Sequence, residues 1–174
     1  MLLELTDALT HQGDSRPFKI SGNLPEGSLP EDIKIVSPVT VSGTMTAIGH
    51  DIAIVGEISA QAQTNCALCL KPMDILISCE YNELLRRQGF AGDDEEEDEV
   101  IVQEAVYFDG SACDLSESAA YAVLLQLSMR YVCSEECKGL CPKCGADLNV
   151  QPCDCDRYEN SPFSALASLF KEEE

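Results

Sequence analysis

Residues 39–60 read VTVSGTMTAIGHDIAIVGEISA, and this stretch decides the fold. Apolar and polar side chains alternate on both sides of the turn residues 49–51, which predicts two half-buried strands joined as an antiparallel hairpin. The alternation resumes after Pro72 and predicts a third strand, so we expect an antiparallel meander. The residues expected to face the core are Val39, Val41, Met45, Ala47, Ile52, Ile54, Ile58, Ala60, Met73, Ile75, Ile77, Cys79 and Tyr81.

Segments on either side extend this sheet into an α+β core. Residues 100–108 form an apolar run that predicts a fourth strand, and shorter strands are expected near 18–20 and 33–36. The capping-box pattern from Asp114 to Glu117 predicts the start of a helix. Apolar residues cover nearly the whole circumference of that helix, so we expect it to be buried against the sheet and covered on its other sides. These residues are Ala119, Ala120, Val123, Leu124, Leu125 and Leu127.

The expected fold class is therefore α+β, with an antiparallel sheet packed on one buried helix and a cysteine-rich, zinc-ribbon-like lobe at the C-terminal end. Residues 1–132 are expected to form the core, with an acidic loop at 91–99. Residues 133–174 are expected to form the metal lobe. This lobe is expected to end in a short amphipathic helix that starts near Asn160.

The chain is strongly acidic, with a formal net charge of −20 over 174 residues. Its summed field repels phosphate backbones, so a basic protein is a more natural partner than naked nucleic acid, although acidity also serves plain solubility. The first residues lack a basic leader, and no segment has the roughly eighteen uninterrupted apolar residues of a membrane helix. We therefore expect a cytoplasmic protein without membrane contact.

Eight of the ten cysteines fall into four close pairs. A two-residue gap lets both sulfurs of a pair reach one ion at about 2.3 Å, and four thiolates complete a tetrahedral zinc site. Cytosolic thiols are kept reduced, which favours metal ligation over disulfides. We expect one or two zinc ions per chain. The candidate ligands are Cys66, Cys69, Cys133, Cys137, Cys141, Cys144, Cys153 and Cys155.

Three pairings of these four pairs into two sites are possible. The preferred division joins the pair 66/69 with the pair 133/137 and leaves 141/144 with 153/155 as a local site. Cys79 and Cys113 are excluded because free buried cysteine is common. Reduced structural thiols, a redox-active pair and an iron–sulfur cluster are ranked below zinc. Four-thiolate sites leave no open position for water, and His11 and His50 lie in no catalytic motif, so no enzyme is expected.

Three motifs together resemble the YceD-like family, also described as a domain of unknown function. They are Cys66-Ala-Leu-Cys69-Leu70, Cys137-Lys-Gly-Leu-Cys141-Pro142 and Asn160-Ser-Pro-Phe163. The resemblance implies a bacterial or organellar cytosolic protein that is needed for accumulation of large-subunit ribosomal RNA and has no catalytic activity. Some relatives lack the CPKCG and CxC pairs, which agrees with one core site and one accessory site. Ala67-Leu68 is a departure, because the family usually carries a basic residue at the second place.

The resemblance and the charge together favour an assembly factor or escort that binds a basic ribosomal protein or the pre-ribosomal large subunit. Two alternatives stay open. One is a direct RNA-binding zinc protein with a patch of Arg86, Arg87, Arg130, Lys138 and Lys143. The other is a redox sensor that opens its cysteine sites under oxidant.

Overall fold

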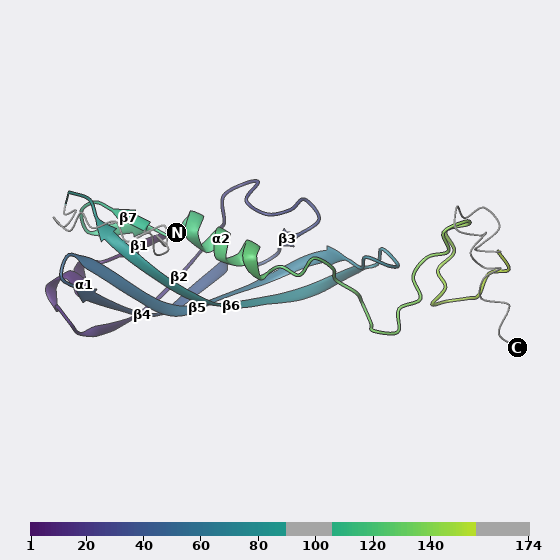
Figure 1. Ribbon diagram of the computed structural model, residues 1–174, viewed down its shortest axis with the longest axis horizontal. Coiled ribbons are helices and arrows are strands. Elements are labelled where there is room, and N and C mark those ends of the chain that lie inside the picture. Colours follow the sequence, from purple (N-terminus) through teal and green to yellow (C-terminus); the bar gives the residue numbers. More distant parts are fainter. Residues whose placement is uncertain (90–105, 156–174) are drawn as a thin grey trace, which may run out of the picture. The chain divides into compact units, whose positions relative to one another are not determined.

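A computed structural model describes residues 1–89 and 106–155 of the chain (Figure 1). The predicted acidic loop at 91–99 and the predicted helix near Asn160 lie outside these residues. The elements are β1 (Leu2–Glu4), α1 (Thr6–Thr10), β2 (Ser15–Gly22), β3 (Lys34–Ile35), β4 (Val39–Ile48), β5 (Asp51–Asn65), β6 (Pro72–Arg87), β7 (Val106–Phe108), β8 (Ala112–Asp114) and α2 (Ser116–Gln126).

The chain divides into two compact units. The first, which we call the sheet unit, comprises Met1–Thr64 and Asp74–Met129. The second, the cysteine unit, comprises Asn65–Met73 and, among the described residues, 130–155. The tip of the β5–β6 connection thus belongs to the same unit as the cysteine-rich segment that follows α2.

The predicted hairpin is confirmed. Strands β4 and β5 pair antiparallel, from Thr40 opposite Ser59 to Ile48 opposite Asp51. Gly49 adopts a φ of 63° in the connecting turn, in the left-handed region that glycine enters without steric penalty. The apolar residues expected to face the core on these two strands are buried. Strand β6 lies next to β5, which completes the predicted meander.

The sheet is mixed, which corrects the expectation of a purely antiparallel one. Its order is β2-β4-β5-β6-β7, with β3 pairing the far part of β5. Strand β7 pairs parallel with β6, from Leu85 opposite Val106 to Arg87 opposite Phe108. The connection between them, residues 88–105, is long enough for the crossover that parallel strands require. Of the predicted strand at 100–108, residues 100–105 lie outside the described part of the chain.

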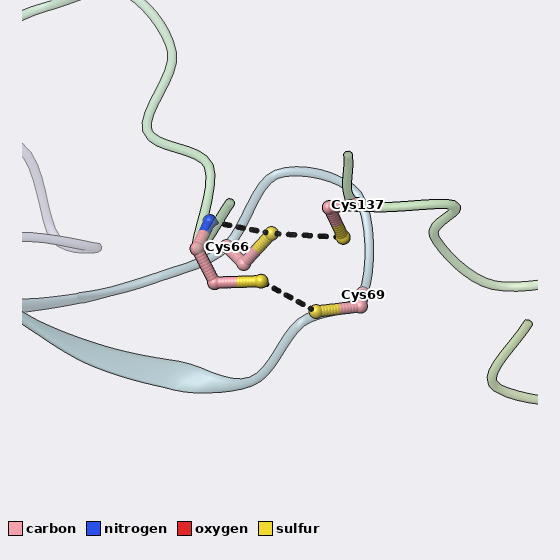
Figure 2. Close-up of side chains that lie close together, drawn as sticks. Cys66, Cys69 and Cys137 are labelled. Carbon is pink, nitrogen blue, oxygen red and sulfur yellow. Dashed lines mark hydrogen bonds between the residues drawn. The ribbon is translucent and has the colours of Figure 1, made fainter. Parts of the chain in front are cut away.

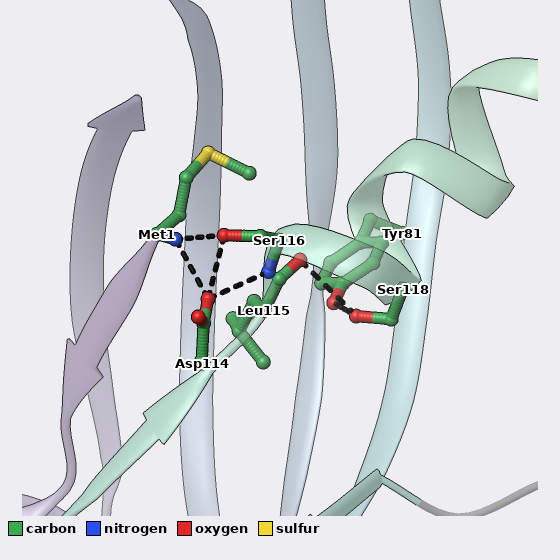
Figure 3. A network of polar contacts seen from close by, with 6 residues as sticks. All are labelled: Met1, Tyr81, Asp114, Leu115, Ser116 and Ser118. Atoms are coloured by element: carbon green, nitrogen blue, oxygen red, sulfur yellow. Dashed lines mark hydrogen bonds and ion pairs between the residues drawn. The ribbon is translucent and has the colours of Figure 1, made fainter. Parts of the chain in front are cut away.

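The predicted start of a helix is confirmed, although the capping pattern is incomplete. Helix α2 begins after Leu115, and no side chain caps it at that position. Asp114 instead ends β8, where its carboxylate accepts hydrogen bonds from the Met1 ammonium at 2.7 Å and the Ser116 backbone N–H at 2.9 Å (Figure 3). Contact with the ammonium is the main reason that the pKa of Asp114 falls to about 2. The aspartate therefore joins the separate two-stranded sheet β1–β8 to the start of α2.

The expectation that α2 is covered on all sides is wrong. Ala119, Ala120 and Val123 are buried, whereas Tyr121 and Leu125 are more than 60% exposed. A polar contact on the buried side joins the Ser118 hydroxyl to the Tyr81 hydroxyl of β6 at 2.5 Å (Figure 3). Small side chains allow one face of the helix to approach its neighbours closely, and the apolar residues on the other face stay in solvent. The five-residue α1 is a second helix that the sequence did not predict.

Gly43 and Gly56 face each other in the β4–β5 ladder, and this pair gives a first testable expectation. A Cβ atom on Gly43 would lie 2.3 Å from the Val55 carbonyl oxygen and 2.5 Å from the Gly56 Cα atom. Since both obstacles are backbone, the substitution Gly43→Ala is expected to lower the free energy of unfolding by about 1–3 kcal/mol.

Urea denaturation followed by circular dichroism measures this change. The control is Thr44→Ala, next to it on β4, where the side chain is exposed and an effect within about 0.5 kcal/mol is expected. Equal stability of the two variants would contradict the close packing of the two strands at this point.

Candidate metal centres

The first cysteine cluster joins two segments of the cysteine unit that lie far apart in the sequence. Cys66 and Cys69 come from the loop between β5 and β6, and Cys133 and Cys137 from the segment after α2. The Cys66 and Cys137 sulfurs are 3.9 Å apart, and the Cys69 and Cys133 sulfurs are 3.6 Å apart (Figure 2). All four sulfurs lie within 4.8 Å of one another.

These distances fit a tetrahedral metal site. Four sulfurs about 2.3 Å from a central ion are separated by about 3.8 Å, which lies between these two sulfur–sulfur distances. A disulfide, at about 2.05 Å, is far shorter, and all ten cysteines are free thiols. The cluster could therefore hold a metal ion such as zinc.

Backbone amides around Cys66 favour its thiolate form. Its sulfur accepts hydrogen bonds from the backbone N–H groups of Leu68 at 3.5 Å and Cys133 at 3.4 Å. The backbone N–H of Cys69 contributes most to lowering the pKa of Cys66 to about 6, with these two groups adding to it. The loop closes through the Leu70 N–H, which donates to the Cys66 carbonyl at 2.9 Å.

Crowding of the sulfurs has the opposite effect on Cys133. The hydrogen bond with Cys69 is the largest cause that raises the pKa of Cys133 to about 12, because a thiol that donates to a neighbouring sulfur is favoured in its protonated form. Four thiolates at these distances therefore need a cation among them, which is what a bound divalent metal would supply.

The second cluster is local in sequence. The sulfurs of Cys141, Cys144, Cys153 and Cys155 all lie within 4.8 Å of one another. Gly145 ends the tight turn after Cys144 with a φ of 72°, and its N–H donates to the Cys141 carbonyl at 2.9 Å. The backbone N–H of Cys144 is the main cause that lowers the pKa of Cys141 to about 6. An isolated antiparallel bridge joins Leu140 and Asp147 across the turn. A complete zinc ribbon at this cluster stays a prediction.

The structure brings the eight candidate ligands together in the division that the sequence favoured. Metal ligation itself stays a prediction. Cys79 and Cys113 lie in the sheet unit and join neither cluster. The Cys79 thiol donates to the Ala122 carbonyl of α2 at 3.9 Å, and Cys113 is buried in β8, where burial raises its pKa to about 11.

Sequence reasoning missed three polar residues beside the clusters. The Asn149 amide donates to the Cys137 sulfur at 3.6 Å, and Lys71 pairs with Asp147 at 2.8 Å. This contact with Lys71 is the main reason that the pKa of Asp147 falls to about 2. The only sequence signal for Asp147 and Asn149 is the Asp-Leu-Asn run shortly after Cys144-Gly145, and Lys71 has no such signal.

The five basic residues of the predicted RNA patch divide between the two units. Arg86 and Arg87 end β6 in the sheet unit, whereas Arg130, Lys138 and Lys143 belong to the cysteine unit. Arg86 is already within ion-pair distance of Asp51, at 3.8 Å.

Membrane insertion through a helix finds no support in the described residues. None of the helices there is both long enough and apolar enough to cross a bilayer.

Comparison with known proteins places the chain in a family. Residues 54–170 match the family model described as large ribosomal RNA subunit accumulation protein YceD. The chain belongs to the YceD family. No solved structure gives a significant match to this YceD-family chain.

Two relatives illustrate the similarity. An uncharacterised protein of Mycobacterium tuberculosis H37Rv is 32% identical over 109 residues, which cover 61% of this YceD-family chain and 49% of the relative. A chloroplastic Arabidopsis thaliana protein, named large ribosomal RNA subunit accumulation protein YCED homolog 1, is 39% identical over 57 residues, or 32% of the chain and 18% of the relative. The chain thus spans about half the length of the mycobacterial relatives that it matches.

Proposed function

We propose that this protein supports accumulation of large-subunit ribosomal RNA, and hence ribosome biogenesis, as a non-enzymatic binding or escort factor stapled by zinc. The observation that carries the proposal is the family match over residues 54–170. The name of the Arabidopsis relative supports the same role. The proposal places the protein in the cytoplasm, where thiols are kept reduced for metal binding.

Zinc is proposed as a structural staple because of the donor set. Each cluster offers four thiolates, and an ion bound by all four would have no open position for water or substrate. Cys66, Cys69, Cys133 and Cys137 would hold one ion, and the four cysteines from 141 to 155 a second. We therefore propose two zinc ions per chain and no catalytic role for either.

A basic partner is proposed on the ground of charge. With a net charge of −20, the protein attracts a basic ribosomal protein and repels exposed phosphate. The partner proposed is thus a basic ribosomal protein, free or already part of the pre-ribosomal large subunit. Such an association weakens as salt screens the charges.

Deletion of the gene combined with sucrose-gradient fractionation tests this function. The protein is expected to sediment with precursors of the large subunit at low salt and to leave them as the salt concentration rises. In the deletion strain, the ratio of large-subunit to small-subunit ribosomal RNA is expected to fall. Absence of the protein from every precursor fraction, together with an unchanged RNA ratio, would refute the proposal.

The same sucrose gradients distinguish the alternative, direct RNA binding, from binding to a ribosomal protein. A variant with Arg86, Arg87, Arg130, Lys138 and Lys143 changed to glutamine is expected to sediment as the wild type does, because the proposed contact is with protein. Loss of sedimentation with the precursors in this variant alone would favour RNA contact over an escort role.

A further inference from the structure

A chain of polar contacts joins the first cysteine cluster to residues 147–149, which lie in the loop that the second cluster closes. The Asn149 side-chain amide donates to the Cys137 sulfur of the first cluster at 3.6 Å and to the Asp147 carboxylate at 2.7 Å. The other carboxylate oxygen of Asp147 pairs with Lys71 at 2.8 Å. Lys71 in turn follows the first pair of ligands, and its carbonyl accepts from the Cys66 N–H at 2.8 Å.

Backbone contacts reinforce the same link. The Leu140 N–H donates to the Leu68 carbonyl at 3.0 Å, so the segment between the clusters lies directly against the loop of the first. Gly139 allows this approach, because a Cβ atom there would lie 2.9 Å from the Leu68 oxygen and its φ is 73°. The Leu148 N–H then donates to the Gly139 carbonyl at 3.0 Å.

Asn149 and Asp147 belong to the loop that the second cluster closes. They lie between Cys144 and Cys153, yet the atoms that they contact, on Cys137 and Lys71, belong to the first cluster and its loop. Among residues 138–155 the structure buries Gly139, Cys141 and Leu148 and no other residue. So small an apolar contribution leaves a metal at the second cluster as the main means of fixing this loop.

We propose that Asn149 and Asp147 are positioning residues that couple the two metal sites, so that filling the second site strengthens metal binding at the first. Metal at the second site fixes the loop and with it the Asn149 amide that donates to the Cys137 sulfur. By linkage, metal at the first site strengthens the second by the same factor. This inference rests on the proposed binding of two metal ions.

An order of filling follows from the chain lengths. The second site is closed by residues 141–155 alone, whereas Cys69 and Cys133 of the first are 64 positions apart. The shorter loop loses less entropy on closure. The second site therefore binds its metal before the first site does, and this binding places Asn149 beside the first site.

The first test removes the donor at Asn149 in the full chain with both sites loaded. In the variant Asn149→Ala, zinc release from the first site to a chromophoric chelator is expected to be about 10 to 100 times faster. Asn149→Asp keeps an acceptor for the Lys138 N–H, which Asn149 binds at 2.8 Å, but lacks the donor, so it is expected to behave as the alanine variant does. Asn82→Ala on the exposed side of β6 is the matched control with unchanged release.

Cadmium-113 NMR reports the chemical shift of the metal at each site, which would stay unchanged if Asn149 only stabilised the fold. Two resonances are expected from the cadmium-loaded chain, and variants of either cluster assign them. Asn149→Ala is expected to shift the resonance of the first site and to leave that of the second in place. The variant Cys141→Ser with Cys144→Ser empties the second site and is expected to speed zinc release from the first by a similar factor.

The outcomes separate this inference from the proposed function. Two bound metal ions with release rates and resonances unchanged in Asn149→Ala would overturn the coupling and leave the zinc staple standing. A chain that takes up no metal would overturn the coupling and the staple together. The role in ribosomal RNA accumulation is decided independently by the gradient experiment.

Discussion

Replacing Cys66 and Cys69 together by serine is expected to release one metal ion per chain and to unfold the part of the cysteine unit that the first cluster holds, residues 65–73 and 130–140. Among the described residues of the whole unit, Leu148 is the only buried aliphatic side chain, and the other buried positions are Gly139 and three of the cysteines themselves. Metal coordination thus takes the place of a hydrophobic core. Structural zinc in small domains contributes an apparent free energy of about 10–16 kcal/mol, which packing around one leucine cannot replace.

Metal content and amide hydrogen exchange together measure this effect. Amides of residues 65–73 and 130–140 are expected to lose protection, whereas those of β4, of β5 and of residues 141–155, which the second cluster still closes, keep theirs. The control is Cys79→Ser, which changes a cysteine outside both clusters and leaves metal content unchanged. Full retention of protected amides in the double variant would show that the unit is held by something other than metal.

Truncating Ile54 is expected to have the largest effect on the sheet unit. Its side chain is 1% exposed in the first part of β5, so Ile54→Ala removes apolar contacts and leaves a cavity, with an expected loss of about 2–5 kcal/mol in the free energy of unfolding. Its neighbour Val55 points to the other face and is 61% exposed. Val55→Ala is therefore a matched control on the same strand, with an expected loss below about 1 kcal/mol.

Urea denaturation monitored by circular dichroism compares the two variants, with metal content measured in parallel. Both variants are expected to retain bound metal, because neither residue is a ligand or touches one. Similar losses for Ile54→Ala and Val55→Ala would contradict the assignment of the inward face of β5.

The parts of the fold that could be predicted are those specified by local alternation. On β4 and β5 the period of two identifies the buried face, and Gly49 marks the turn, so strand ends and register follow from neighbouring residues. The parallel pairing of β7 with β6 depends on a contact across a long connection, which no local pattern encodes. Helix α2 misled the prediction because its exposed leucines are indistinguishable in sequence from buried ones.

In the candidate site too, features set by neighbouring residues could be predicted, whereas contacts between distant segments could not. Close spacing predicted the four cysteine pairs, and the position of the first pair between two strands favoured its partner at 133/137. Lys71, Asp147 and Asn149 could not be predicted, because their relation to Cys137 exists only once the two segments meet in space. Polar residues that support a metal site carry no spacing rule comparable to that of its ligands.

Native mass spectrometry of the purified chain, compared with its mass after denaturation, tests the central claim most directly. Two zinc ions per chain are expected in the native protein, one in a variant of either cluster, and none after stringent chelation. Chelation is also expected to remove the dispersed amide signals of the cysteine unit. A native chain without metal, whose amide spectrum is the same before and after chelation, would contradict the claim that thiolate-bound metal holds this unit together.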